Sequence, residues 1–256
     1  ALTCLRGVNR CRVPTTLLAQ VDASIGGKTA INLKSGKNLA GSFYFPKSVI
    51  ADPEFLTTLP ERDLKSGMGE IIKYAFIEDT IAEATDYKKG PRPLFSSLAE
   101  NFSHGISAEN AALEPSISCC IRMKIAVVNK DPFEKKLRRC LNLGHTLAHG
   151  IEKVSKYAVT HGEAVSIGTV FAFRLAVKTG LIEESLLKIV ENLNSTLGLP
   201  SEIPAELDRE AIIQVIAYDK KREGDSIKFV RTEKQLGKVN LEFSITPAEI
   251  ARFLKD

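Results

Sequence analysis

The chain has 256 residues, of which 44% are hydrophobic and 26% are charged, a balance typical of globular proteins. This composition excludes collagen, a coiled coil and wholesale disorder, and at ~150 residues per domain the length predicts one large or two small domains. The net charge of +4 is too small to indicate nucleic-acid binding. No apolar run approaches the ~20 residues of a membrane helix, so we expect neither nucleic acid nor membrane as a partner.

The cysteines indicate a reducing compartment. Their number is odd and they show no Cys-x-x-Cys spacing: Cys4, Cys11, Cys119, Cys120 and Cys140. A disulfide framework is therefore not expected, and we predict a cytoplasmic protein. The sequence shows no signal peptide, and it begins with Ala1 rather than Met, which indicates a fragment or a processed chain.

Residues 10–60 alternate short apolar segments with turns. Glycine turns at 24–29 and 35–38 each carry a lysine, and the β-branched run at 48–51 predicts a short strand. From Pro60 onward the spacing of apolar residues becomes helical. The predicted helices span 61–76, 116–130, 140–155, 161–179, 184–197, 208–218 and 247–255. A hairpin is predicted at 225–232 and 236–243. The sequence thus predicts a short α/β part followed by a larger, mostly helical part.

Three of the four histidines fall close together, at His145, His149 and His161. On a helix over 140–155, the two residues His145 and His149 would share one face with Arg138 and Asn142. From the residues alone two interpretations stay open. The stripe is either a solvated helix face or a face that binds a ligand, because histidine is a common metal ligand. His161 begins a further helix and is available to complete such a site.

Basic residues also follow glycine turns. Lys28 comes after Gly26 and Gly27, and Lys37 and Asn38 come after a Ser-Gly pair. Taken singly, such residues are most often surface charges. Turns that present Lys and Asn beside backbone N–H groups can also bind anions.

Seven stretches of the sequence resemble the motifs of the 3-dehydroquinate synthase family, a group of sugar-phosphate cyclases. They occur in the family's order and at its spacing, and they span nearly the whole chain. They are VPTTLLAQVDASIGGKT at 13–29, GKN at 36–38, TLP at 58–60, GEIIKY at 69–74, LNLGHT at 141–146 with His149, HGEAV at 161–165 and DKK at 219–221.

The resemblance implies a fold in two parts. Residues 1–60 would be the C-terminal portion of a Rossmann-like, NAD-binding α/β domain, and residues 61–256 a mostly α-helical domain that binds metal and substrate. The family's glycine-rich NAD turn is missing from this sequence, so the chain alone is expected to hold NAD weakly. A homodimer is also implied.

The implied reaction converts 3-deoxy-D-arabino-heptulosonate 7-phosphate into 3-dehydroquinate and phosphate, a step of the shikimate pathway. It proceeds by transient oxidation with NAD, elimination of phosphate, re-reduction and intramolecular aldol closure. The enzyme would be a carbon-oxygen lyase that requires NAD and a divalent metal, Zn²⁺ or Co²⁺. Its small-molecule partner, a sugar acid phosphate, carries two anionic groups, which would explain several cations in a nearly neutral protein.

The resemblance also implies roles for individual residues. The metal ligands would be Glu70, His145 and His161. The NAD-binding residues would be Thr15, Thr16, Asp22, Lys28, Lys37, Phe55, Thr58 and Leu59. The substrate carboxylate would contact Lys28, Lys124 and Arg138, and its hydroxyls Asp22, Lys73 and Glu134. The substrate phosphate would contact Asn38, Asn142, His149, Lys220 or Lys221, and Arg6 across a dimer interface. The catalytic residues would be Lys73, Lys124, Glu134, Arg138, Asn142 and His149.

Other activities remain as alternatives. Deoxy-scyllo-inosose and epi-valiolone synthases differ at the positions of Asn142 and His149, and an aminodehydroquinate synthase would differ only in an amino-for-hydroxyl change of its substrate. A metal-dependent alcohol or glycerol dehydrogenase would not need the anion-binding residues Lys124 and Arg138. A metal-binding helical fragment without turnover is the non-catalytic alternative.

Overall fold

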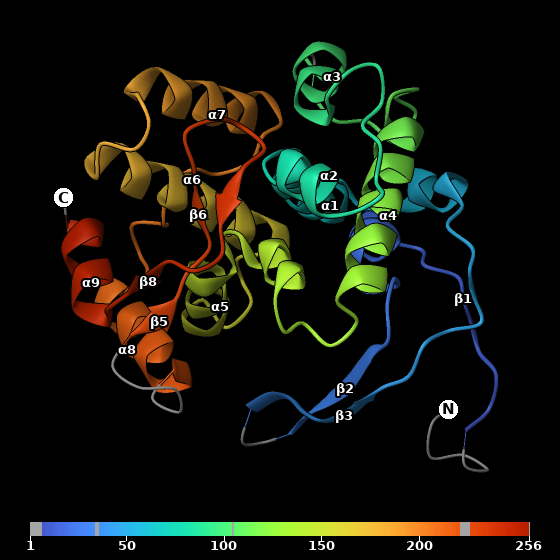
Figure 1. Cartoon of the computed structure of the whole chain (residues 1–256), viewed down its shortest axis with the longest axis horizontal. Helices are drawn as coiled ribbons and strands as arrows, with labels where there is room; N and C mark the ends of the chain where they lie inside the picture. Colours follow the sequence, from blue (N-terminus) through green and yellow to red (C-terminus); the bar gives the residue numbers. More distant parts are fainter. Residues whose placement is uncertain (1–6, 34–35, 104, 221–225, 256) are drawn as a thin grey trace.

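A computed structural model of the chain describes residues 7–33, 36–103, 105–220 and 226–255. The N-terminal part holds the strands β1 (Cys11–Arg12), β2 (Lys28–Leu33), β3 (Gly36–Phe43) and β4 (Ser48–Val49). β1 pairs with β4 in parallel, and β2 pairs with β3 as an antiparallel hairpin, which extends below the helices in Figure 1. Two short helical segments, η2 (Ala19–Ala23) and η3 (Pro53–Thr58), complete this part.

The rest of the chain is mainly helical. The helices are α1 (Glu61–Ala75), α2 (Glu78–Ala84), α3 (Leu94–Asn101), α4 (Leu113–Lys130), η4 (Leu137–Asn142), α5 (His145–Val154), α6 (His161–Lys178), α7 (Glu184–Thr196), α8 (Arg209–Lys220) and α9 (Pro247–Lys255). Between α8 and α9, β5 (Ile227–Lys228) pairs with β8 (Ser244–Ile245), and β6 (Arg231–Thr232) pairs with β7 (Val239–Asn240). Among the described residues, no helix has the length and apolar character needed to cross a bilayer.

The helix α1 illustrates why these segments are helical. Pro60 precedes it, where a missing N–H costs nothing, and Glu61 and Asp63 in its first turn complement the helix dipole. Its buried residues include Leu64 and Met68, which join the core. α1 packs on α6, and α6 packs on α5. The three helices therefore meet in the interior of the molecule (Figure 1).

Glycines allow α1 and α6 to touch backbone to backbone. A Cβ atom on Gly162 would lie 1.8 Å from the Ser66 carbonyl oxygen, and one on Gly69 would lie 2.3 Å from the Gly162 carbonyl oxygen. Neither position has room for a larger residue, because both neighbours are main-chain atoms. The close approach sets Glu70, the next residue of α1, opposite the first turn of α6.

Most predicted helices are confirmed, but the prediction of one helix over 140–155 is wrong. The chain forms η4, turns at Gly144 with φ of 78°, and then begins α5 at His145. Glycine is required there, because its φ is in the left-handed region and a Cβ on Gly144 would lie 2.7 Å from the Val165 carbonyl oxygen of α6. Arg138 and Asn142 therefore do not share a helix with His145 and His149. The helices α2 and α3 were not predicted.

We expect Gly162→Ala to lower the free energy of unfolding by about 1–3 kcal/mol, because overpacking against main-chain atoms outweighs the ~1 kcal/mol gain in helix propensity. Denaturant titration measures this change. Gly90→Ala is the control, since a Cβ there meets only the Arg92 carbonyl oxygen at 3.7 Å. Equal stability of the two variants would contradict the close contact between α1 and α6.

Candidate metal and substrate site

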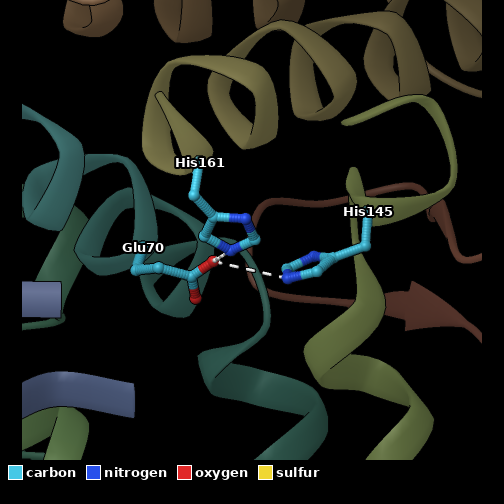
Figure 2. A group of neighbouring side chains, drawn as sticks. All are labelled: Glu70, His145 and His161. Atoms are coloured by element: carbon cyan, nitrogen blue, oxygen red, sulfur yellow. Dashed lines mark ion pairs between the residues drawn. The ribbon is translucent and has the colours of Figure 1, made fainter. Parts of the chain in front are cut away.

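Three helices each contribute one side chain to a compact group. Glu70 comes from α1, and His145 and His161 are the first residues of α5 and α6. The Nε2 atoms of His145 and His161 lie 3.4 and 3.2 Å from Oε1 of Glu70 (Figure 2). The potential ligand atoms of all three residues lie within 4.8 Å of one another. The fold thus brings together the three residues expected to bind metal.

The outer nitrogens of both imidazoles face oxygen atoms. Nδ1 of His145 lies 3.1 Å from the Leu143 carbonyl oxygen, and Nδ1 of His161 lies 3.4 Å from Oε1 of Glu152. We assign the ring proton of each neutral imidazole to Nδ1, where it is donated to these oxygens. The inner Nε2 atoms then keep lone pairs for a cation, the usual arrangement of metal-bound histidines.

The group fits a divalent metal ion. With both imidazoles neutral and protonated at Nδ1, Oε1 of Glu70 is buried and has no hydrogen-bond donor among the described residues. Leaving a carboxylate oxygen in this state is costly, and a cation between the three side chains would satisfy it. One carboxylate and two imidazoles form a common ligand set for catalytic zinc, with a coordination position left open.

The pKa values of the histidines reflect the same environment. Burial lowers the pKa of His145 to about 3, so this imidazole is neutral. Burial also acts against the charged form of His161, but hydrogen bonds and charges from Glu152 and Glu70 outweigh it and raise its pKa to about 9. Without metal, a positive charge therefore resides on His161 at pH 7. Metal binding would release this proton.

A buried network links the metal ligands to the N-terminal part. Lys73 forms an ion pair with Glu70, and its Nζ lies 3.8 Å from Oδ1 of Asp22. Nζ of Lys124 lies 2.7 Å from the same Oδ1 and 2.6 Å from the Asp22 carbonyl oxygen. The Tyr74 hydroxyl donates a hydrogen bond of 3.0 Å to Oδ1 as well. Burial opposes ionisation of Asp22, yet Lys124 and Lys73 hold its pKa well below the usual range.

Beside His145 lies a cavity of about 470 Å³. Its lining is Lys28, Glu134, Lys135, Arg139, Asn142, His145, Thr146, His149, Gly150, Val215, Ile216, Lys228 and Val230. Glu134 forms an ion pair with Lys28 and accepts a 2.8 Å hydrogen bond from Asn142. Because Glu134 is the one acid in this lining and is already paired, the remaining cations favour an anionic ligand.

Arg138 packs against the glycine turn that precedes Lys28. Its guanidinium group donates to the Pro132 carbonyl oxygen at 2.7 Å, and a Cβ on Gly26 would lie 3.3 Å from it. Burial, followed by the charges of Arg138 and Lys124, lowers the pKa of Lys28 to about 8. These three cations, expected to bind the substrate carboxylate, therefore influence one another electrostatically.

Other expected residues are not part of this cavity. Thr15 and Thr16 precede η2, and Phe55, Thr58 and Leu59 lie on or beside η3; none of the five lines the cavity. Arg6 and Lys221 lie outside the described residues. The backbone of Lys37, Asn38 and Lys220 is described, but their side chains are not.

Several residues of the site were not found from the sequence. Tyr74 and Glu152 contact expected site residues, and Arg139 and Lys228 line the cavity. Glu152 had a weak signal, since it lies one helical turn after His149. Lys228 had none, because β5 is far from the histidines in the sequence and reaches the cavity only through the tertiary fold.

Comparison with known proteins assigns the fold to a class. A 2-epi-5-epi-valiolone synthase from Streptomyces hygroscopicus subsp. jinggangensis, solved with NAD⁺ and Zn²⁺, matches with a TM-score of 0.83 at 26% identity, over 100% of this chain and 68% of that one. A 2-deoxy-scyllo-inosose synthase complexed with carbaglucose-6-phosphate, NAD⁺ and Co²⁺ matches with a TM-score of 0.83 at 29% identity, over 99% and 68%. The fold is that of the sugar-phosphate cyclases.

Sequence comparison then identifies the family. Models of the N-terminal and C-terminal parts of 3-dehydroquinate synthase match residues 1–66 and 67–222. The 3-dehydroquinate synthase of Desulforamulus reducens is 39% identical over 255 residues, which make up 99% of this chain and 67% of that protein. The chain belongs to the 3-dehydroquinate synthase family, and it spans about two thirds of the length of the curated relatives it matches.

We expect Asp22→Asn to lower the free energy of unfolding of the metal-free chain by about 3 kcal/mol at pH 7, because two buried ammonium groups lose their shared carboxylate. Since the folded-state pKa of Asp22 lies below the unfolded value, its contribution is complete above about pH 5 and is lost as the pH falls below about 4. Urea titrations across this range measure the difference between variant and wild type.

The exposed ion pair of Glu61 and Lys65 provides the control. Glu61→Gln should change the free energy of unfolding only slightly at every pH, because solvent screens both this pair and the interaction of Glu61 with the helix dipole. A difference between Asp22→Asn and wild type that grows in acid would contradict the assignment of a low pKa to Asp22.

Proposed function

We propose that the protein catalyses the 3-dehydroquinate synthase reaction, the conversion of 3-deoxy-D-arabino-heptulosonate 7-phosphate into 3-dehydroquinate and phosphate. The observation that carries this proposal is the group of one carboxylate and two imidazoles beside a cavity rich in cations. A dianionic sugar phosphate suits such a cavity, whereas a simple alcohol would not need it. Release of phosphate by elimination makes the enzyme a carbon-oxygen lyase.

The proposed metal ligands are Glu70, His145 and His161, with Zn²⁺ or Co²⁺ as the ion. When bound there, such an ion would polarise a substrate hydroxyl and stabilise the negative charge that develops on its oxygen. For NAD, which supplies hydride transfer, the proposed contacts are Thr15, Thr16, Asp22, Lys28, Lys37, Phe55, Thr58 and Leu59. Their place in the N-terminal part, together with the NAD⁺ in the two solved relatives, supports this proposal.

The remaining site residues would bind and orient the substrate. In this proposal Lys28, Lys124 and Arg138 hold the carboxylate. The phosphate is held by Asn142 and His149, with Asn38, Lys220 or Lys221, and Arg6. Asp22, Lys73 and Glu134 contact hydroxyls, and the ammonium groups of Lys124 and Lys73 keep Asp22 ionised. Lys73 in addition holds Oε2 of Glu70, which leaves Oε1 for the metal.

We also propose the division at residue 60, with a Rossmann-like remnant before it and the metal- and substrate-binding domain after it. The change from strand pairs to helices at α1 supports this boundary. We further propose that the chain forms a homodimer in the cytoplasm. The cysteines within the described ranges, Cys11, Cys119, Cys120 and Cys140, are all free thiols, which agrees with a reducing compartment.

We expect the purified chain to bind about one zinc ion, because its ligand set suits that metal. Glu70→Gln and His145→Ala should each abolish this binding. His149→Ala is the matched control, since His149 lines the cavity without belonging to the ligand group. Elemental analysis after dialysis, together with calorimetric titration, measures the outcome. Zinc retained by His145→Ala would refute the ligand assignment.

We expect Lys228→Ala to weaken binding of the heptulosonate phosphate to the zinc-loaded chain about tenfold, the effect of one lost hydrogen bond to a charged group. Lys234→Ala is the control, because Lys234 is exposed on the connection between β6 and β7 and does not line the cavity. Calorimetry measures both affinities. Equal affinities of the two variants would place the substrate outside this cavity.

A further inference from the structure

The imidazole of His161 lies between two carboxylates from different helices. Its Nε2 lies 3.2 Å from Oε1 of Glu70 on α1, and its Nδ1 lies 3.4 Å from Oε1 of Glu152 on α5. The Glu152 side chain is only 7% exposed. A carboxylate in such a position is costly to bury unless it has a partner that carries or donates a proton. The outer nitrogen of His161 supplies that proton.

The two histidines of the group are held in different ways. The outer nitrogen of His145 faces the Leu143 carbonyl oxygen, which is neutral and belongs to the turn before α5. The outer nitrogen of His161 faces the carboxyl group of Glu152. A carboxylate partner makes an imidazole a stronger electron donor than a carbonyl partner does, because it stabilises positive charge on the ring.

The backbone of His161 is firmly held, but its ring needs a separate restraint. Thr160 and Glu163 form a reciprocal capping box at the start of α6, and Gly162 packs against Ser66. These contacts fix the Cα position of His161 and leave rotation about its side-chain bonds free. The side chain is 28% exposed, so packing restrains the ring only in part. Glu152 provides the directional contact.

We propose that Glu152 is a positioning residue that fixes the orientation and the ring proton of His161, so that Nε2 is presented as a metal ligand. Glu152 does not touch the metal in this proposal; it acts through His161. The carboxylate accepts the Nδ1 proton, keeps the lone pair on Nε2, and adds a second negative charge close to a divalent ion. This inference rests on the proposed metal site of Glu70, His145 and His161.

Two substitutions separate the contributions of Glu152. Glu152→Gln keeps an oxygen that can accept the Nδ1 proton but removes the charge, whereas Glu152→Ala removes both. We expect Glu152→Ala to weaken Zn²⁺ binding 10–100-fold, the usual effect of losing such a partner, and Glu152→Gln to weaken it less. Competition with a chromophoric chelator measures the affinity. The visible absorption bands of the Co²⁺-loaded chain should shift in both variants, because these bands report ligand geometry.

The matched control is Glu191→Gln on α7, which alters a partly buried carboxylate paired with Arg174 and outside the ligand group. Its Zn²⁺ affinity and Co²⁺ spectrum should equal those of wild type. Denaturant unfolding of each metal-free variant distinguishes positioning of His161 from a merely structural role of Glu152. A structural role would lower the free energy of unfolding without changing the affinity for Zn²⁺. Wild-type affinity and spectrum in both Glu152 variants would overturn the inference alone. Failure of wild type to bind Zn²⁺ or Co²⁺ would overturn the proposed metal site and the inference together.

Discussion

The backbone contact between α1 and α6 is the constraint on which the site depends. Gly69 and Gly162 allow the two helices to approach until Ser66 and Gly162 touch main chain to main chain. At this spacing Glu70 faces the first residue of α6 across a distance that one metal ion can bridge. Larger residues at either glycine would separate the helices, and the carboxylate would then lose contact with His161.

Charge balance is the second condition that the fold has to meet. Glu70 is a buried carboxylate and Asp22 a partly buried one, and Lys73 and Lys124 stand next to them with equal and opposite charge. Removing only a carboxylate or only an ammonium group would leave a buried ion without a partner. This is far more costly in free energy than the loss of a surface ion pair. The network also couples η2 in the N-terminal part to α1 and α4, so the two parts of the chain share one polar core.

Much of this could be predicted from the sequence, but by two different routes. Regular apolar spacing located helices such as α1 and α6 directly, and long motifs identified Glu70, His145 and His161 through resemblance to a family. Apolar spacing gave the wrong helix around Gly144, because the left-handed backbone of this glycine, with φ of 78°, interrupts a pattern that is typical of one helix. Lys228 was missed because contacts made only in three dimensions leave no local pattern, and Glu152 was missed although it lies one helical turn after His149.

The positions of the two histidines within their helices have an electrostatic consequence. His145 and His161 are the first residues of α5 and α6, so the positive ends of two peptide dipoles lie beside the same point. Such ends repel a cation slightly and attract a negatively charged oxygen. If a metal ion binds as proposed, Glu70 and Glu152 would favour the ion itself, and the two helix ends would favour negative charge on a substrate oxygen beside it.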